Sequence, residues 1–148
     1  MIPILESLDE LSGRYDALFC DLWGCLHDGK RVYPAAVEAL RRFRSAGGVV
    51  VLMTNAPRPA FSVERHLERL GAPEDCRDAV VSSGDAALES VAAGDWGRRV
   101  FHIGAEKDEA FFDVAQVERV RMEDAESVIC TGLADDLTET PEDYLDLL

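Results

Sequence analysis

Residues 17–24 read Ala-Leu-Phe-Cys-Asp-Leu-Trp-Gly, and residues 48–55 read Gly-Val-Val-Val-Leu-Met-Thr-Asn. Each stretch is a short apolar run that stops at a polar side chain, Asp21 in the first and Thr54 in the second. Apolar runs of this length that end on a polar residue are typical of strands buried in a parallel sheet. The two stretches therefore predict two strands of one parallel sheet.

A helix is predicted between these two strands. Pro34 suits its first position, Gly47 supplies a left-handed stop, and apolar residues recur between them at helical spacing. The recurring residues are Ala36, Ala39, Leu40 and Phe43. A strand, a helix and a second strand make one βαβ unit.

The alternation of strand and helix signals continues along the chain. A second helix is predicted over residues 60–70, then a strand at 79–81 and a helix from about Asp85 to Ala92. The apolar face of the second helix consists of Ala60, Val63, Leu67 and Leu70. This order predicts an α/β fold in which a parallel sheet carries helices on both faces.

A second unit is predicted after Gly97, because residues 94–97 (Gly-Asp-Trp-Gly) interrupt the alternation. We place the domain boundary there, which divides the chain into residues 1–97 and 98–148. The elements expected after the boundary are strands at 99–103 and 127–130 and a helix near 107–117.

The chain ends on a helix-start signal in which Thr140 is the cap, Pro141 the first residue and Asp143 the partner in a capping box. That helix has only residues 141–148 to run, which is short of the mean of about 11–12 residues. A truncated chain and a short terminal helix that docks on its domain both agree with this ending.

Composition excludes several classes of protein. The chain has 148 residues, of which 47% are hydrophobic, and 15 Lys and Arg stand against 29 Asp and Glu, for a net charge of −14. The apolar content is enough for a core. The excess of acidic residues argues against nucleic acid or an anionic membrane as a partner.

The sequence also predicts a cytoplasmic protein. No apolar run approaches the ~20 residues of a membrane helix, and residues 1–6 lack the basic start and long apolar stretch of a signal peptide. The cysteines are Cys20, Cys25, Cys76 and Cys130. They have no CxxC spacing and lie in or beside apolar segments, so we expect buried thiols rather than disulfides or zinc ligands.

The candidate chemistry lies where the first two strands end. In a parallel α/β sheet, ligands bind beyond the carboxyl ends of the strands, which is where Asp21 and Thr54 are placed. A carboxylate there can attack a phosphoryl group or hold Mg2+, and a neighbouring hydroxyl can donate hydrogen bonds to phosphate oxygens. This pair of residues suits phosphoryl transfer.

These motifs resemble those of the haloacid dehalogenase superfamily, in particular the phosphohydrolases of its subfamily IIA. Residues 18–29 are similar to the first motif, an apolar strand with a nucleophilic Asp and a following loop, and residues 50–58 are similar to the second, which closes on Thr-Asn. Weaker landmarks of the subfamily follow at residues 81–87, 101–104 and 130–132. The resemblance implies a Rossmann-like parallel sheet core, followed after Gly97 by the start of an α/β cap domain.

The resemblance also implies roles for four residues. Asp21 would be the nucleophile that forms an aspartyl-phosphate, Thr54 would bind the transferred phosphoryl group, and Asn55 would lie in the phosphate or substrate shell. Asp21 and the backbone carbonyl of Trp23 would coordinate Mg2+. The implied activity is Mg2+-dependent hydrolysis of small phosphate esters, with a small phosphorylated metabolite as the substrate.

One departure from the family concerns Trp23, which stands where the family usually has a second Asp that acts as general acid and then general base. Indole can do neither task, and the loss of such a group costs about 10²–10⁴-fold in rate. Some members of the subfamily are similar in carrying Asp-x-Trp-Gly here. His27 or Asp28 is the alternative proton-transfer group.

A second departure is that two further motifs of the family, a Lys and an acidic Mg2+-binding pair, are not found. The only lysines are Lys30 and Lys107, and neither follows the expected strand. Residues 135–136 (Asp-Asp) are better interpreted as a solvated acidic turn. The chain as given is therefore expected to be inactive or weak, as the N-terminal portion of a longer phosphohydrolase.

The alternative function is a non-catalytic protein that retains the fold and binds a phosphorylated metabolite or a protein partner. Trp23 is the residue that favours it. Apolar surface left open by a missing half would also permit self-association into a homo-oligomer.

Overall fold

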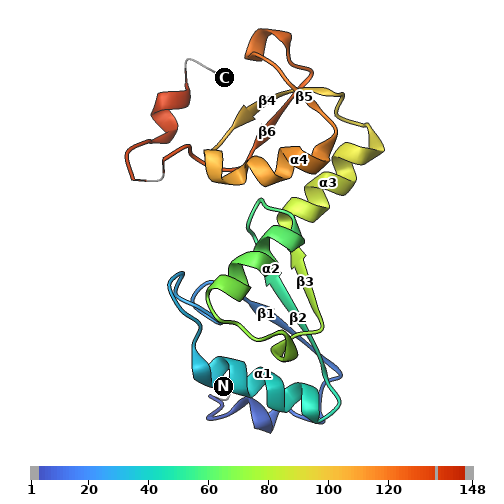
Figure 1. Cartoon of the computed structure of the whole chain (residues 1–148), viewed down its shortest axis with the longest axis vertical. Coiled ribbons are helices and arrows are strands. Elements are labelled where there is room, and N and C mark those ends of the chain that lie inside the picture. The colour runs from blue at the N-terminus through green and yellow to red at the C-terminus, as the bar shows by residue number, and fades with distance from the viewer. Residues whose placement is uncertain (1–3, 136, 146–148) are drawn as a thin grey trace. The chain divides into compact units, whose positions relative to one another are not determined.

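The computed structural model describes residues 4–135 and 137–145. Contacts divide the chain into two compact units: residues 1–56 with 60–82, and residues 57–59 with 83–148. Figure 1 labels the helices and strands of both units.

The first unit is built on a three-stranded parallel sheet, ordered β1-β2-β3 (Figure 1). Its strands are β1 (Ala17–Asp21), β2 (Val49–Thr54) and β3 (Ala79–Ser82). Asp21 pairs with Met53 across the first strand pair, and Thr54 pairs with Ser82 across the second. All three predicted strands are confirmed, and their carboxyl ends meet at one edge of the sheet.

Helices α1 (Pro34–Ser45) and α2 (Ala60–Arg69) connect the strands. Pro34 begins α1 as predicted, and the buried side of α1 carries Val37, Leu40 and Phe43. Leu40 and Phe43 belong to the predicted apolar face, whereas Ala36 and Ala39 are only half-buried beside Val37. The larger side chains reach deeper into the core, because a methyl group is too short to bridge a helix and a sheet.

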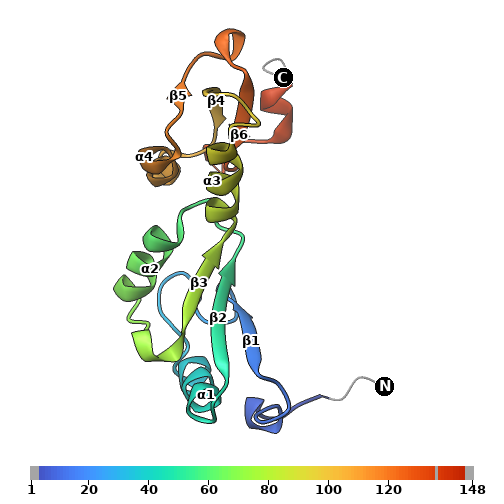
Figure 2. The same cartoon turned by 90° about the vertical axis from the view of Figure 1, so that its right-hand side faces the viewer.

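Both helices lie on the same face of the sheet, as Figure 2 shows. Val50 and Leu52 of β2 point under them and are fully buried. The residues on the other face are exposed, including Phe19 (64%), Met53 (44%) and Val81 (45%).

The prediction of helices on both faces is therefore wrong for the described residues. Strands β1, β2 and β3 follow one another in space in chain order, and crossovers between parallel strands are right-handed as a rule. Successive right-handed crossovers in one direction place their helices on one side. A sequence pattern of buried strands does not reveal this order.

The second unit holds a smaller parallel sheet, ordered β5-β4-β6. Its elements are α3 (Ser83–Ala93), β4 (Arg99–Ile103), α4 (Phe112–Ala115), β5 (Glu118–Arg119) and β6 (Ser127–Cys130). Val91 of α3 packs with Phe111 and Ala115 in the core of this unit. This contact groups α3 with the second unit. The predicted domain boundary at Gly97 therefore lies within the second unit, between α3 and β4. The division into domains at residue 97 stays a prediction.

The helix predicted near 107–117 is divided. Residues Glu106–Phe111 form a 3-10 helix, α4 continues to Ala115, and Gln116 ends it with a left-handed φ of 50°. Strand β5, of two residues, was not predicted, because so short a strand carries no periodic signal.

The capping box predicted near the end of the chain is confirmed. The Thr140 N–H donates to Asp143 Oδ2 at 2.8 Å, and residues Pro141–Tyr144 form a single 3-10 turn rather than the α-helix expected there. The last part of the predicted helix, residues 146–148, lies outside the described residues. None of the helices in the described ranges has the length and apolar character needed to span a bilayer.

The cysteines are free, but their burial differs from the prediction. Cys76 is fully buried and Cys20 half-buried, whereas Cys25 and Cys130 are exposed. The two exposed thiols lie in the loop after β1 and at the open side of β6, where proximity to apolar residues in sequence does not mean burial. Burial raises the pKa of Cys20 to about 11, so this thiol stays protonated at neutral pH.

Candidate active site

The loop after β1 folds back on itself and fixes Asp21 at its start. The Leu22 N–H donates to Asp21 Oδ1 at 2.8 Å, and Leu22 itself is buried at 3% exposure. The carbonyl of Leu22 accepts the N–H groups of Leu26 and His27, and the Gly24 N–H donates to the His27 carbonyl. The bond from Leu22 holds one carboxylate oxygen of Asp21, which is an exposed residue.

Asp21 and Thr54 line one open hollow at the carboxyl ends of β1 and β2. Met53 and Asn55 complete the lining, and the hollow has a volume of about 480 Å³. Thr54 Oγ1 accepts the Ala56 N–H at 3.1 Å, which leaves its own O–H able to donate elsewhere. The structure thus brings together Asp21, Thr54 and Asn55, which were selected from the sequence.

Trp23 extends from the same loop, and its side chain is 66% exposed. Its ring packs against the backbone at Gly29, where a Cβ atom would lie 2.3 Å from Trp23 Cζ3. The indole and the buried imidazole of His27 form a T-shaped pair with ring centroids 5.9 Å apart, and His27 forms another such pair with His66 at the same distance. The indole is therefore exposed but held in place.

His27 and Asp28 both have structural roles in this loop. His27 Nδ1 accepts the Gly29 N–H at 3.1 Å, and burial lowers the pKa of His27. Asp28 Oδ1 accepts the N–H groups of Lys30 and Arg31, each at 2.9 Å, and these bonds lower the pKa of Asp28. A carboxylate held ionised in this way is a poor proton donor at neutral pH, so these contacts do not favour Asp28 as a substitute general acid.

Comparison with known proteins decides the family. The sequence profile of the haloacid dehalogenase-like hydrolases matches residues 18–118. The chain belongs to this family. The predicted α/β fold with a Rossmann-like parallel sheet is thereby confirmed. No curated protein matches the chain.

Solved structures support the same assignment. A haloacid dehalogenase-like hydrolase from Brucella suis 1330 is 45% identical, with a TM-score of 0.88 over 98% of this chain and 55% of that one. A 4-nitrophenylphosphatase from Thermotoga maritima is 25% identical, with a TM-score of 0.61 over 86% of this chain and 47% of that one.

A glycerol phosphate phosphatase from Mycobacterium tuberculosis, solved in complex with magnesium, is 27% identical, with a TM-score of 0.63 over 93% of this chain and 41% of that one. The chain thus spans about half the length of these structures.

Among the described residues, the loop after β1 offers few oxygen donors for a metal ion. Asp21 offers a carboxylate, and Trp23 offers a backbone carbonyl two residues later. Oxygen donors of this kind are those that Mg2+ prefers, and Mg2+ is commonly held by one or two carboxylates together with water and substrate phosphate. Within the described residues there is no group of three or more His, Cys, Asp or Glu side chains that could hold a metal.

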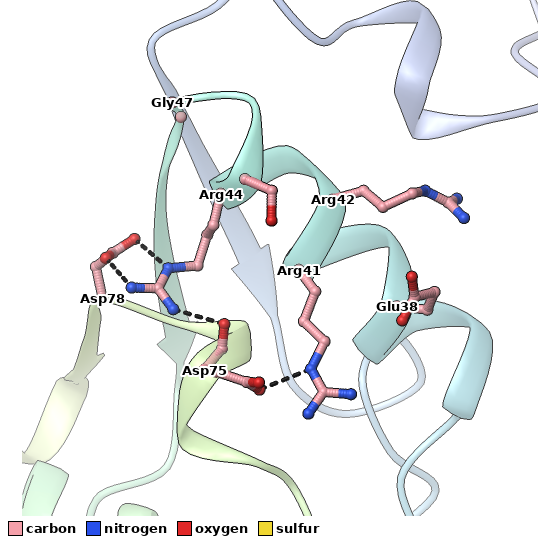
Figure 3. Close-up of a pocket in the computed structure, with 9 residues that line it drawn as sticks. Glu38, Arg41, Arg42, Arg44, Gly47, Asp75 and Asp78 are labelled. Atoms are coloured by element: carbon pink, nitrogen blue, oxygen red, sulfur yellow. Dashed lines mark hydrogen bonds and ion pairs between the residues drawn. The ribbon is translucent and has the colours of Figure 1, made fainter.

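A larger hollow of about 600 Å³ lies at the opposite end of the strands, beside the end of α1 (Figure 3). Its arginines are all paired with carboxylates: Arg41 with Asp75, Arg42 with Asp9, and Arg44 with Asp78. Asp78 also accepts the Val50 N–H at 2.7 Å. The pair of Arg44 and Asp78 ties α1 to the amino ends of β2 and β3, and the other two pairs tie α1 to the 3-10 helices Leu8–Glu10 and Glu74–Cys76. The hollow therefore has a structural explanation.

Sequence reasoning missed two residues of the site. Met53 lines the hollow because it stands opposite Asp21 in the strand register, and its place just before Thr54 in an alternating strand is the signal that could have found it. Gly29 allows the indole to approach the backbone closely. The Asp28-Gly29 pair predicts a turn with a positive φ at Gly29, which is 82° in the structure, but it does not predict that the Trp23 ring packs there.

Proposed function

We propose that this haloacid dehalogenase-like hydrolase cleaves small phosphate esters, with Asp21 as the nucleophile. The observation that carries the proposal is the shared hollow, in which the Asp21 carboxylate and the Thr54 hydroxyl lie at the carboxyl ends of adjacent parallel strands. Such strand ends are where α/β sheets bind ligands. Asn55 lines the same hollow and would contribute a further polar group to substrate binding.

The proposed reaction has two steps. Asp21 Oδ2 attacks phosphorus, the bond from phosphorus to the ester oxygen breaks, and the electron pair leaves on that oxygen. Water then attacks the aspartyl-phosphate, gives up a proton to solvent, and releases phosphate with Asp21 restored. The Thr54 O–H donates to a phosphoryl oxygen throughout, while the Leu22 N–H keeps the carboxylate of Asp21 oriented.

We also propose that Mg2+ is the cofactor. Asp21 and the Trp23 carbonyl would hold the ion, and its chemical contribution when bound is to neutralise phosphoryl charge. Support comes from the type of donor in the loop and from the related phosphatase that was solved with magnesium and, in another crystal, with calcium.

The test is a comparison of Asp21→Asn with Asp16→Asn in the full-length protein, assayed with Mg2+ on a panel of phosphate esters. Asp16 is an exposed carboxyl at the other end of the same strand, so it controls for the loss of one charge. We expect D21N to abolish phosphate release and D16N to leave it within twofold of wild type. Retention of activity by D21N would overturn the proposed mechanism.

The second candidate is a protein that binds a phosphorylated metabolite or a protein partner without turnover. Trp23, in the place of the usual proton-transfer group, is the observation that favours it. It predicts binding of inorganic phosphate that depends on Thr54, with no ester hydrolysis in the full-length protein.

Self-association remains a prediction in either case. The open face of the first sheet, with Phe19, Met53 and Val81, is the surface on which it rests. Sedimentation velocity of the chain over a range of concentrations tests self-association. A monomer at all concentrations would contradict this prediction. A cytoplasmic location also remains a prediction.

A further inference from the structure

Trp23 is the large exposed side chain of the loop that begins at the nucleophile. It is 66% exposed, whereas its neighbours Leu22 and Leu26 are at 3% and 0%. Those two leucines anchor the loop in the core of the first unit. The indole thus stands on an anchored loop, two residues after the Asp21 carboxylate.

The indole also packs against two neighbours, Gly29 and His27, in the absence of a ligand. The absent side chain of Gly29 lets the ring approach the backbone, since a Cβ there would lie 2.3 Å from Cζ3 and 2.6 Å from Cη2. His27, at 5% exposure, forms a T-shaped pair with the indole, and its Nδ1 accepts the Gly29 N–H. A group fixed in this way loses little conformational entropy on binding a ligand.

The loop does not supply an obvious acid for the leaving group. The indole has no proton that it can transfer, and the Asp28 carboxylate is occupied by the N–H groups of Lys30 and Arg31. The His27 imidazole is buried at 5% exposure, with its Nδ1 accepting the Gly29 N–H. An ester cleaved here is therefore favoured when its oxygen can depart as a stable anion.

We propose that Trp23 is a specificity-determining residue that stacks on an aromatic leaving group, so that aryl phosphates are the preferred substrates. The inference rests on the proposed function. The bond from Asp21 Oδ2 to phosphorus forms, the bond from phosphorus to the aryl oxygen breaks, and the electron pair stays on an aryloxide that later takes a proton from water. A flat ring meets the indole face, and the aryloxide needs no acid to leave.

The kinetic test compares phenyl phosphate with cyclohexyl phosphate in wild type, Trp23→Leu, Trp23→Phe and Trp96→Leu. Trp96 is the other tryptophan, 57% exposed in the second unit, and serves as the control. We expect wild type to prefer the aryl ester and W23L to raise KM for phenyl phosphate about 2- to 10-fold, with W23F close to wild type. W96L should not change the preference.

A leaving-group series separates this inference from the proposed function. Across substituted phenyl phosphates, kcat/KM of wild type should rise steeply as the phenol becomes more acidic, and Trp23→Asp should flatten that dependence. Equal kcat/KM for phenyl and cyclohexyl phosphate, with W23L acting on both alike, would overturn the inference while leaving Asp21 as the nucleophile. Loss of activity in D21N tests the nucleophile separately.

Binding gives a readout that does not need turnover. In a Trp96→Phe variant of this chain, the tryptophan fluorescence comes from Trp23 and reports on ligand binding beside it. Phenylphosphonate should quench its emission at a concentration at which methylphosphonate does not. Identical responses to the two phosphonates would contradict stacking on Trp23.

Discussion

Asp21 and Thr54 line the same hollow, although a loop and a helix separate them in the sequence. The register explains this, because Asp21 pairs with Met53 and Thr54 is the next residue along β2. Backbone pairing thereby sets the positions of the two residues, and the N–H groups of Leu22 and Ala56 bond to their side chains.

Thr54→Ala should weaken catalysis without unfolding the protein. The variant removes the O–H that donates to the phosphoryl group, and a hydrogen bond to a charged group is worth about 1.5–3 kcal/mol. We therefore expect kcat/KM to fall about 10- to 100-fold, while Thr54→Ser, which keeps the hydroxyl, stays near wild type. Steady-state kinetics with matched circular dichroism spectra check this, and equal activity of the alanine and serine variants would contradict it.

Gly29→Ala should move the indole of Trp23. The Cβ would meet the ring at 2.3 Å, and the exposed ring can swing away, so the cost in the free energy of unfolding is mainly the strain of a φ of 82°, about 1–2 kcal/mol. Gly71→Ala is the matched control, since its φ is 83° and nothing lies within 4 Å of its Cβ.

Urea unfolding and Trp23 fluorescence in a Trp96→Phe background distinguish the two glycine variants. Both should be destabilised to a similar extent, but only G29A should change the emission of the folded protein. An unchanged emission in G29A would show that the indole does not pack on residue 29 in solution.

The pair of Arg44 and Asp78 should make stability depend on pH in the acid range (Figure 3). The hydrogen bond from Arg44, with that from the Val50 N–H, lowers the pKa of Asp78 in the folded chain. The unfolded chain then binds the proton more readily, so the stabilisation is present above the ordinary Asp pKa of about 3.9 and is lost as the pH falls through the lower folded value.

Asp78→Asn should remove that dependence. Urea unfolding from pH 6 to pH 2.5 should show a smaller loss of unfolding free energy for D78N than for wild type, and Asp95→Asn, at an exposed carboxyl, should match wild type. A wild-type slope in D78N would mean that the pair does not form in solution.

Leu52→Ala and Met53→Ala should differ sharply, because these neighbours on β2 point to opposite faces of the sheet. Leu52 is fully buried under the helices, and Met53 is 44% exposed. Removing Leu52 should cost about 2–5 kcal/mol, whereas removing Met53 should cost below about 1 kcal/mol. Chemical denaturation of the 148-residue chain measures both, and equal costs would show that the second face is covered.

The sequence predicted the strand ends better than it predicted the layers around them. Strand ends are marked by an abrupt change from apolar to polar residues, which is why the amino-acid pattern alone places Asp21 and Thr54. The side on which α1 and α2 pack depends on the spatial order of the strands, and the position of Trp23 depends on Gly29, with which it shares no periodic pattern. The prediction of one continuous helix near residues 107–117 was wrong, because the first turns of this segment are 3-10 and Gln116 ends it with a left-handed φ.

The most direct measurement of the central claim is chemical trapping of the covalent intermediate. The full-length protein is mixed with Mg2+ and phenyl phosphate and then quenched with borohydride. Borohydride reduces an aspartyl-phosphate to homoserine. We expect homoserine at position 21 in the peptide mass spectrum, present with substrate and absent without it. Release of phosphate with no modification at Asp21, or with the modification at another carboxylate, would contradict it.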